Sequence, residues 1–302
     1  MNLDFSDIKV LLIGDFMIDH YIFGTSTRMS PEAPVPVVVP EKEYSIPGGA
    51  GNVAMNLSLL GADVTCVGNV GNDIWGQKLL SILRNEGIKT ELIEVIDNHP
   101  TTLKQRIYSD GKQVARLDTE KIMNWQSSSN IEKDYDIIIL SDYNKGVLNS
   151  SWININDLAN VIIDPKKDSF IHYKDATIVT PNLNELEKAS DIDIKDNESI
   201  INACNKLIKE NSFEYIVAKK GNQGITIVGN DNFVKHIEAH YIESPDVTGA
   251  GDTVIAALSL AYAQTNDIDF SAKFANAAAA VVVGKAGTAT TTIEEIKELL
   301  AR

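Results

Sequence analysis

The chain has 302 residues, of which 44% are hydrophobic and 23% charged, a composition typical of a soluble globular protein. These values exclude disordered, collagen-like and coiled-coil proteins. With 27 basic and 42 acidic residues, the formal net charge is −15, which argues against a nucleic-acid-binding protein because such proteins present basic surfaces to phosphates.

Several features predict a cytoplasmic location. The longest apolar runs, 137–140 and 277–283, are far shorter than the roughly 20 residues that span a bilayer. Residues 1–9 lack the basic segment that opens a signal peptide. The chain has two cysteines, Cys66 and Cys204, which both lie in apolar periodic segments and are expected to be reduced core residues.

Apolar runs alternate with helical patterns along most of the chain. Residues 9–14 form a continuous apolar run that ends in glycine, as a buried parallel strand does. This alternation predicts βαβ units and a parallel sheet covered on both faces. The other strands are expected at 63–68, 137–140, 161–163, 176–179 and 215–218, and helices at 52–60, 73–85, 249–264 and 271–283, with a last helix opening at a capping box at 292–295.

Two segments depart from this alternation. Residues 20–44 contain four of the nine prolines and short apolar stretches. Residues 101–119 alternate apolar and polar side chains around Asp110-Gly111, a strong signal for a two-residue hairpin turn. We expect both segments to form a small antiparallel sheet inserted into the α/β body, where it acts as a lid.

The motif with the clearest chemistry is Pro245-Asp-Val-Thr-Gly-Ala-Gly-Asp-Thr253. Its small residues, 249–251, let backbone N–H groups approach a ligand, and the helix that begins there directs its positive end to the same place. An anion such as a phosphate fits this site. Asp252 in the first helical turn is then expected to be a general base, or else simply a favourable charge at a helix N-terminus.

Three motifs resemble those of the ribokinase (PfkB-type) sugar kinase family: 246–252, Gly48-Gly-Ala-Gly-Asn52 and Asn182-Leu-Asn-Glu185. They occur in the family's order, and the resemblance covers nearly the whole chain. It implies a ribokinase-like three-layer α/β fold with a mostly parallel central sheet and a small β-sheet lid. It also implies one kinase domain, 1–302, with lid segments at about 20–44 and 101–119.

The resemblance assigns the catalytic roles. Asp252 is expected to take the proton from the sugar hydroxyl, and the amides of Gly249, Ala250 and Gly251 to hold the transferring phosphoryl group. Asn182 and Glu185 are expected to hold Mg²⁺ through water molecules, since Mg²⁺ keeps several of its waters. From its spacing alone, the pair Asn182 and Glu185 predicts a helix N-cap with a capping-box acid.

Sugar-binding residues are expected at the carboxyl ends of strands and in the lid. Acidic residues that follow strands can accept hydrogen bonds from hydroxyls, while glycines allow backbone contact and an asparagine adds an amide. Basic residues can bind a phosphate on the sugar or on ATP. Each charged residue alone could equally be a solvated surface group. The residues assigned to the sugar are Asp15, Asp19, Gly48, Gly49, Asn52, Lys104, Arg106, Asp142 and Lys145.

The resemblance also places ATP and a monovalent cation. The nucleotide is expected at Lys166, Asn182, Lys219, Gly221, Gly224 and Asn276. Family members often bind potassium through backbone carbonyls beside the anion site, and the matching positions here are Asp246, Thr248, Val282 and Gly287. A homodimer joined through the lid sheets is expected, because an exposed sheet edge favours a partner.

Further stretches resemble the family members that phosphorylate D-glycero-β-D-manno-heptose 7-phosphate, among them 30–37, 140–146 and 163–166. This resemblance implies ATP-dependent phosphorylation of the anomeric hydroxyl. Such kinases are often fused to a nucleotidyltransferase domain, for which we expect no room in 302 residues. Two alternatives stay open: a kinase of the same type that acts on another sugar or sugar phosphate, and a non-catalytic nucleotide-binding regulatory protein.

Overall fold

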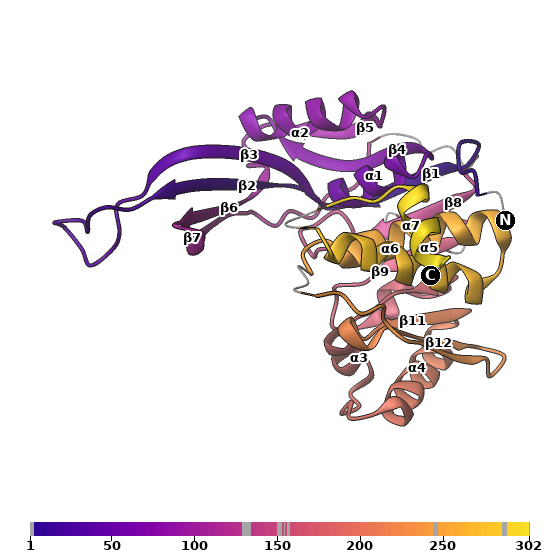
Figure 1. Ribbon diagram of the computed structural model, residues 1–302. Coiled ribbons are helices and arrows are strands. Elements are labelled where there is room, and N and C mark those ends of the chain that lie inside the picture. Colours follow the sequence, from indigo (N-terminus) through magenta and orange to yellow (C-terminus); the bar gives the residue numbers. More distant parts are fainter. Residues whose placement is uncertain are drawn as a thin grey trace.

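The computed structural model describes residues 3–128, 134–149, 153, 155, 158–243, 247–285 and 289–301. These residues form two sheets, a nine-stranded sheet in the body of the molecule and a four-stranded sheet that extends away from it (Figure 1). The carboxyl ends of the parallel strands in the body lie next to the base of the small sheet, and the candidate functional residues lie in this region.

The large sheet has the strand order β13-β12-β11-β10-β9-β8-β1-β4-β5. The seven strands from β11 to β5 run parallel, while β12 and β13 are antiparallel additions at one edge. The bounds are β1 (Lys9–Gly14), β4 (Asp63–Gly71), β5 (Lys89–Ile96), β8 (Ile137–Ser141), β9 (Val161–Asp164), β10 (Ile178–Val179), β11 (Tyr215–Lys219), β12 (Ile225–Gly229) and β13 (Val234–Ile237).

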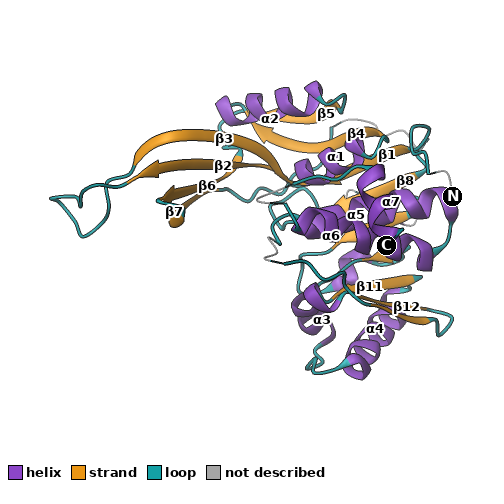
Figure 2. Cartoon of the chain, viewed as in Figure 1, coloured by secondary structure: helices purple, strands orange, loops and turns teal. Residues whose placement is uncertain are grey.

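Helices cover both faces of this sheet and make three layers (Figure 2). Side chains of β1 alternate between two apolar clusters: Val10 and Leu12 belong to one, and Leu11 and Ile13 to the other. The first cluster includes α1 (Ala50–Leu59), α2 (Ile74–Asn85), α5 (Ala250–Thr265), α6 (Ile268–Val283) and α7 (Ile293–Leu300). The second includes α3 (Leu183–Ser190), α4 (Asn197–Asn211) and the 3₁₀ helix η2 (Phe170–Tyr173).

The small sheet has the order β3-β2-β6-β7, with β2 (Phe16–Thr25), β3 (Val39–Gly49), β6 (Thr102–Ser109) and β7 (Lys112–Thr119). Strands β6 and β7 form the predicted hairpin, and its turn residues Asp110 (φ 50°) and Gly111 (φ 77°) adopt the left-handed conformations that a type I′ turn requires. The edge strand β3 contains Pro40 and Pro47, which an edge position tolerates because one of its sides needs no hydrogen bonds.

The expectation of an antiparallel small sheet was wrong for its central pair. Strands β2 and β6 are parallel, with Asp19 opposite Lys104. Both strands start at the carboxyl ends of parallel strands of the large sheet, since β2 follows β1 directly and β6 follows β5. They therefore run outward in the same direction. Part of the predicted lid segment 20–44 is not strand: residues 26–38 connect β2 to β3, and Met29 and Pro36 form an isolated bridge there.

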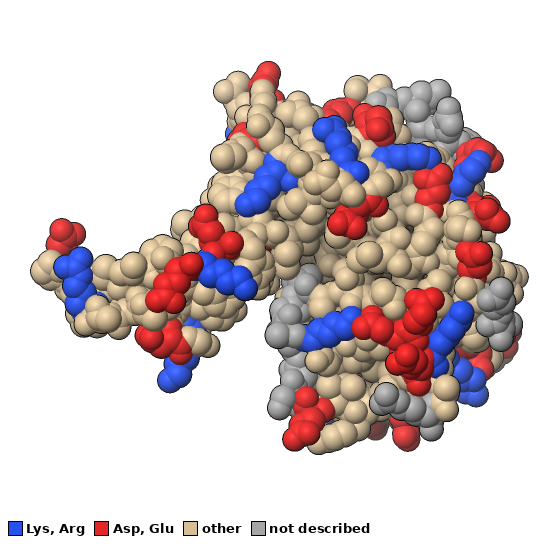
Figure 3. Space-filling model, turned by 45° about the horizontal axis from the view of Figure 1, so that its top comes forward, with Lys and Arg blue, Asp and Glu red and all other residues tan. Residues whose placement is uncertain are grey.

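The predictions of the fold class and of the state of the two cysteines are confirmed. The fold is a three-layer α/β structure with a mostly parallel central sheet and a separate small sheet. Cys66 and Cys204 are free and buried. In the described part of the chain, no helix is long and apolar enough to cross a membrane. On the face shown in Figure 3, basic side chains stand beside acidic ones over both the body and the small sheet.

Candidate active site

Buried carboxylates collect where the parallel strands end. Asp15 follows β1, Asp142 follows β8, and Asp164 is the last residue of β9. Asp15 and Asp142 are 3% and 2% exposed. Carboxyl ends of neighbouring parallel strands are where open α/β sheets bind ligands, so this edge is the candidate active site.

Asp252 lies in the first turn of α5 and is 7% exposed. Its Oδ2 accepts a hydrogen bond of 2.7 Å from the Asn52 amide, and its Oδ1 one of 2.5 Å from the Tyr143 hydroxyl. Burial raises the pKa of Asp252 to about 6, although the hydrogen bonds from Tyr143 and Asn52 oppose that rise. Asp252 is therefore a carboxylate whose pKa lies near neutrality, as a general base requires.

The N-terminus of α5, where an anion site was predicted, combines a glycine N-cap with a neighbouring cation. Gly249 is the N-cap with φ 77°, a left-handed conformation that favours glycine. The Ala250 N–H donates to the Val247 carbonyl at 3.3 Å, which closes the preceding turn. A Cβ on Gly251 would lie 3.6 Å from Lys219 Nζ, so a lysine ammonium stands directly beside the positive end of the helix.

Asp15 organises the loop that follows β8. Its carboxylate accepts backbone hydrogen bonds from Tyr143 (2.9 Å), Lys145 (3.0 Å) and Val147 (3.1 Å). Burial raises the pKa of Asp15, while these backbone bonds oppose that change. The Asp15 oxygens therefore hold the 143–147 loop, a role that its position after a strand did not predict.

Asp19 on β2 lies beside the glycine pair at the end of β3, within the small sheet. Its Oδ1 accepts a hydrogen bond from Arg106 Nη1 at 2.5 Å. A Cβ on Gly48 would lie 2.4 Å from Asp19 Oδ2, and Gly49 has φ 57°. Gly49 therefore needs glycine for its backbone conformation, and a side chain at Gly48 would displace the Asp19 carboxylate, besides the predicted contact of both glycines with a sugar.

Lys104 and Arg106 lie two residues apart on β6 and share one face of the small sheet. Lys104 Nζ is 5.6 Å from the centre of the Tyr143 ring, and the Arg106 guanidinium is 5.1 Å from that of Tyr21. Burial lowers the pKa of Lys104. The sheet thus brings two cationic side chains to the edge of the site where Asp19 and Tyr143 lie.

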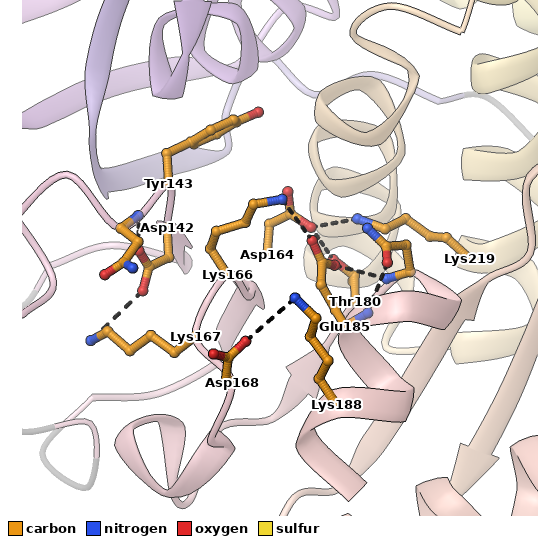
Figure 4. Close-up of polar contacts among 12 residues, drawn as sticks. Asp142, Tyr143, Asp164, Lys166, Lys167, Asp168, Thr180, Glu185, Lys188 and Lys219 are labelled. Carbon is orange, nitrogen blue, oxygen red and sulfur yellow. Dashed lines mark hydrogen bonds and ion pairs between the residues drawn. The ribbon is translucent and has the colours of Figure 1, made fainter. Parts of the chain in front are cut away.

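Asp142 and Lys145 have partners of their own. Asp142 accepts hydrogen bonds from the Asn144 N–H (2.6 Å) and the Tyr173 hydroxyl (2.7 Å), and Lys167 Nζ lies 3.7 Å away (Figure 4). Lys145 forms an ion pair of 2.7 Å with Glu120. A ligand that uses Lys145 must compete with Glu120 for its ammonium.

A second polar cluster surrounds Asp164 and Glu185 (Figure 4). Asp164 accepts hydrogen bonds from Lys219 and, at 3.1 Å, from the Thr180 hydroxyl. Burial raises the pKa of Asp164, and the Glu185 charge adds to that rise. Glu185 also forms an ion pair of 3.1 Å with Lys166.

Asn182 and Glu185 form the capping box that their spacing predicted. The Glu185 N–H donates to Asn182 Oδ1 and the Asn182 N–H to Glu185 Oε2, both at 2.9 Å. Among the residues that the structure describes, no cluster of three or more His, Cys, Asp or Glu could hold a metal ion. The two carboxylates Asp164 and Glu185 nevertheless have the oxygen chemistry that suits Mg²⁺.

The predicted nucleotide residues lie in two neighbouring segments. Gly221 (φ 61°) and Gly224 (φ 87°) shape the turn between β11 and β12, which contains the 3₁₀ helix η3 (Gly221–Gln223). A Cβ on Gly224 would lie 2.0 Å from the Ile237 carbonyl, while Asn276 on α6 donates to the Glu238 carbonyl at 2.8 Å. Segment 237–238 therefore contacts both the turn and α6.

The predicted potassium site is only partly described. The Val282 carbonyl accepts hydrogen bonds from the Gly284 N–H and, at 2.9 Å, from the Lys285 N–H. Thr248 belongs to the turn that leads into α5. Asp246 and Gly287 lie outside the described residues.

The residue-by-residue reading overlooked three site residues: Tyr143, Asp164 and Thr180. Asp164 carries the same signal as Asp15, an acid at the end of an apolar strand, and that rule could have identified it. Tyr143 lies within a stretch that resembled the heptose kinases, but no local pattern shows that its hydroxyl meets a carboxylate 109 residues away.

Comparisons with known proteins agree with this geometry. The family model described as pfkB family carbohydrate kinase matches residues 7–295. A protein from Aliarcobacter butzleri named bifunctional protein HldE is 43% identical over 96% of the chain and 64% of its own length. One of the same name from Nitratiruptor sp. is 40% identical over the same shares. The chain thus spans less than two thirds of the length of these relatives.

Solved structures share the fold. The structure of Arabidopsis thaliana ribokinase complexed with ribose and ATP has a TM-score of 0.78 at 19% identity, covering 98% of this chain and 99% of that one. Phosphofructokinase-2 from E. coli in complex with potassium has a TM-score of 0.74 at 17% identity, covering 97% and 98%.

Proposed function

The chain belongs to the pfkB family of carbohydrate kinases, and from this premise we propose that it transfers a phosphoryl group from ATP to D-glycero-β-D-manno-heptose 7-phosphate. Phosphorylation of the anomeric C1 hydroxyl gives the 1,7-bisphosphate, an intermediate on the route to ADP-heptose and lipopolysaccharide precursors. The stretches that resemble heptose 7-phosphate kinases and the long similarity to bifunctional proteins named HldE support this acceptor.

The observation that carries the proposal is the buried carboxylate of Asp252 at the N-terminus of α5. The anomeric hydroxyl gives its proton to Asp252, and the hydroxyl oxygen attacks the γ-phosphorus while ADP leaves. The amides at 249–251 and the positive end of α5 stabilise the charge that builds on the phosphoryl oxygens. Lys219 adds a cation beside that helix end.

The sugar lies, on this proposal, between the base and the small sheet. The carboxylates of Asp19 and Asp142 accept hydrogen bonds from the sugar hydroxyls, and the Asn52 amide both accepts and donates them. Gly48 and Gly49 lie along the edge of the sugar. Lys104 and Arg106 bind the 7-phosphate, because charge-assisted hydrogen bonds to phosphate are strong. The position of both cations on the face that bears Asp19 supports this arrangement.

Metal ions complete the proposed site. Asn182 and Glu185, with Asp164 opposite, hold Mg²⁺ largely through water molecules. When bound, the ion neutralises charge on the ATP phosphates. The ion pairs that Lys166 and Lys219 now form with these carboxylates support the site, since each shows a place where a cation is stable. A potassium ion at the carbonyls of 246, 248, 282 and 287 is part of the same proposal.

ATP lies along the other side of α5. Its base is placed between the 221–224 turn and Asn276, and its phosphates reach Lys166 and Lys219. The contact of both segments with residues 237–238 supports a shared binding surface. Because ATP and sugar phosphates are cytoplasmic metabolites, we place the reaction in the cytoplasm.

The proposal includes a lid and a dimer. Segments 20–44 and 101–119 close over the sugar and exclude water, which would otherwise compete for the γ-phosphoryl group. Two copies pair through their small sheets. The exposed side chains of Tyr44 on β3 and Leu117 on β7 supply apolar surface on these sheets for a partner.

Ordering of the lid is directly measurable. Amide hydrogen exchange in segments 20–44 and 101–119 is expected to slow markedly when heptose 7-phosphate is added and much less with ATP alone, because only the sugar phosphate reaches Lys104 and Arg106. The parallel strands of the body serve as the internal reference. Equal protection with and without sugar would mean a fixed wall instead of a lid.

The substrate is tested by measuring ADP release with a panel of sugars and sugar phosphates. We expect the highest kcat/KM with D-glycero-β-D-manno-heptose 7-phosphate. A higher value with a hexose phosphate would reassign the acceptor within the same family. Tight ATP binding without turnover on any acceptor would instead favour a regulatory nucleotide-binding protein.

A further inference from the structure

The Tyr143 hydroxyl donates a hydrogen bond to the carboxylate of Asp252, and this bond is short at 2.5 Å. The other oxygen of Asp252 accepts from Asn52. Both hydrogen bonds stabilise the ionised form of the carboxylate, and the shorter one from the phenol lowers the pKa of Asp252 more. Tyr143 is therefore the stronger of the two supports for the ionised base.

The surroundings hold the Tyr143 side chain in place. Its backbone N–H donates to Asp15, which also holds the backbone of Lys145 and Val147. Its ring lies beneath the ammonium of Lys104. Figure 4 shows that the ring points away from Asp142, its neighbour in the chain, whose carboxylate turns toward Lys167.

We propose that Tyr143 is a positioning residue for the kinase reaction, which keeps the Asp252 base ionised so that it can accept the proton of the sugar hydroxyl. This inference rests on the proposed role of Asp252. Burial raises the pKa of Tyr143 well above its usual value, so the phenol keeps its proton and can only donate it in a hydrogen bond. Asn52 keeps the carboxylate oriented without this bond.

Other charges near the pair come from several elements. Asp164 on β9 and Lys219 on β11 act on Asp252 with opposite signs. Asp164 and Asp19 on β2 raise the pKa of Tyr143, and Lys104 on β6 lies over its ring. A substitution that removes only the Tyr143 hydroxyl leaves all these groups in place, so it isolates the hydrogen bond.

The test is Tyr143→Phe, which keeps the ring and its packing. Loss of a charge-assisted hydrogen bond should raise the pKa of the base by about one unit or more. Turnover should then fall at least about fivefold at pH 6 and return to within about twofold of the wild type at pH 9, because the base is ionised there in both proteins. KM for ATP should not change.

Tyr262→Phe is the matched control, since Tyr262 is a buried tyrosine on the same helix as Asp252. Its pH profile should equal that of the wild type. An unchanged profile in Tyr143→Phe would overturn the inference. So would a loss of equal size at every pH, which would place Tyr143 in packing or substrate contact instead.

A second readout needs no substrate. The Asp252 carboxyl can be titrated by ¹³C NMR in the ligand-free protein and assigned by its absence in Asp252→Asn. Its titration midpoint should be higher in Tyr143→Phe than in the wild type, and equal midpoints would contradict the inference. Failure of the proposed acceptor would appear differently, as a wild-type chain that does not prefer heptose 7-phosphate.

Discussion

Replacing Asp252 by asparagine is expected to lower kcat by at least about 10²-fold, the lower limit for loss of a general base. ATP binding should stay nearly unchanged, because the amides at 249–251 and Lys219 are retained. The side chain has nearly the same shape, and the Asn52 amide can rotate to present its oxygen to the new amide. Initial rates and equilibrium ATP binding of the same preparation check both parts.

Stability separates a catalytic from a structural role for Asp252. Its pKa is raised in the folded protein to about 6, so above that pH the buried charge costs up to about 3 kcal/mol of folding free energy, a cost that fades as pH falls toward 4. Asp252→Asn removes the charge and should therefore unfold at an equal or higher temperature at pH 7. Near-normal turnover in this variant would remove Asp252 from the mechanism.

Removing the two cations of β6 together, Lys104→Ala with Arg106→Ala, is expected to raise KM for the phosphorylated sugar at least tenfold. Each charge-assisted hydrogen bond contributes about 1.5–3 kcal/mol, and about 1.4 kcal/mol corresponds to a factor of ten. KM for ATP should change far less. Saturation curves for each substrate, with the other held in excess, measure both constants.

A matched control removes two other basic residues. Lys9→Ala with Lys89→Ala changes the net charge equally. It breaks two exposed ion pairs, with Asp134 and Asp63, at the amino ends of strands β1 and β5, away from the candidate site. It should leave both KM values unchanged. Arg106 also pairs with Asp19, so its loss can affect sugar binding through Asp19 as well as through the 7-phosphate. Unphosphorylated heptose, which lacks that phosphate, separates the two effects and serves as a second comparison. If KM for ATP rises instead, the two cations belong to the nucleotide side.

Local patterns predicted the elements that depend on local chemistry. The apolar run at 9–14 forms β1. The predicted helix that starts near Asp73 is α2, and Asp73 caps it by accepting hydrogen bonds from two backbone N–H groups of its first turn. The turn at Asp110-Gly111 also follows from the residues themselves. The capping box of Asn182 and Glu185 needed only their spacing.

Long-range relationships were not readable in the same way. The parallel pairing of β2 with β6 joins segments about 85 residues apart in register, and a hairpin signal carries no information on it. The bond from Asn52 to Asp252 spans 200 residues. The resemblance to a family placed both residues in one site, but only the fold shows that one donates directly to the other.

Asp15 illustrates a further limit of the sequence. Its position after β1 predicted the same role as for Asp19, a contact with sugar hydroxyls. In the structure Asp15 accepts hydrogen bonds from three backbone N–H groups, while Asp19 pairs with Arg106. The difference arises from the loop after β8, which folds around Asp15 and lies 128 or more residues further along the chain. The antiparallel pairing of β12 with β13 at the sheet edge was also not predicted.

The central claim, phosphoryl transfer to the anomeric hydroxyl of heptose 7-phosphate with Asp252 as the base, is tested most directly by ³¹P NMR of the reaction products. The wild-type chain with ATP, Mg²⁺ and D-glycero-β-D-manno-heptose 7-phosphate should give one new phosphate ester at C1 for each ADP formed. Asp252→Asn should give almost none in the same time. A phosphate at another carbon, or ADP formed without any sugar bisphosphate, would contradict the account.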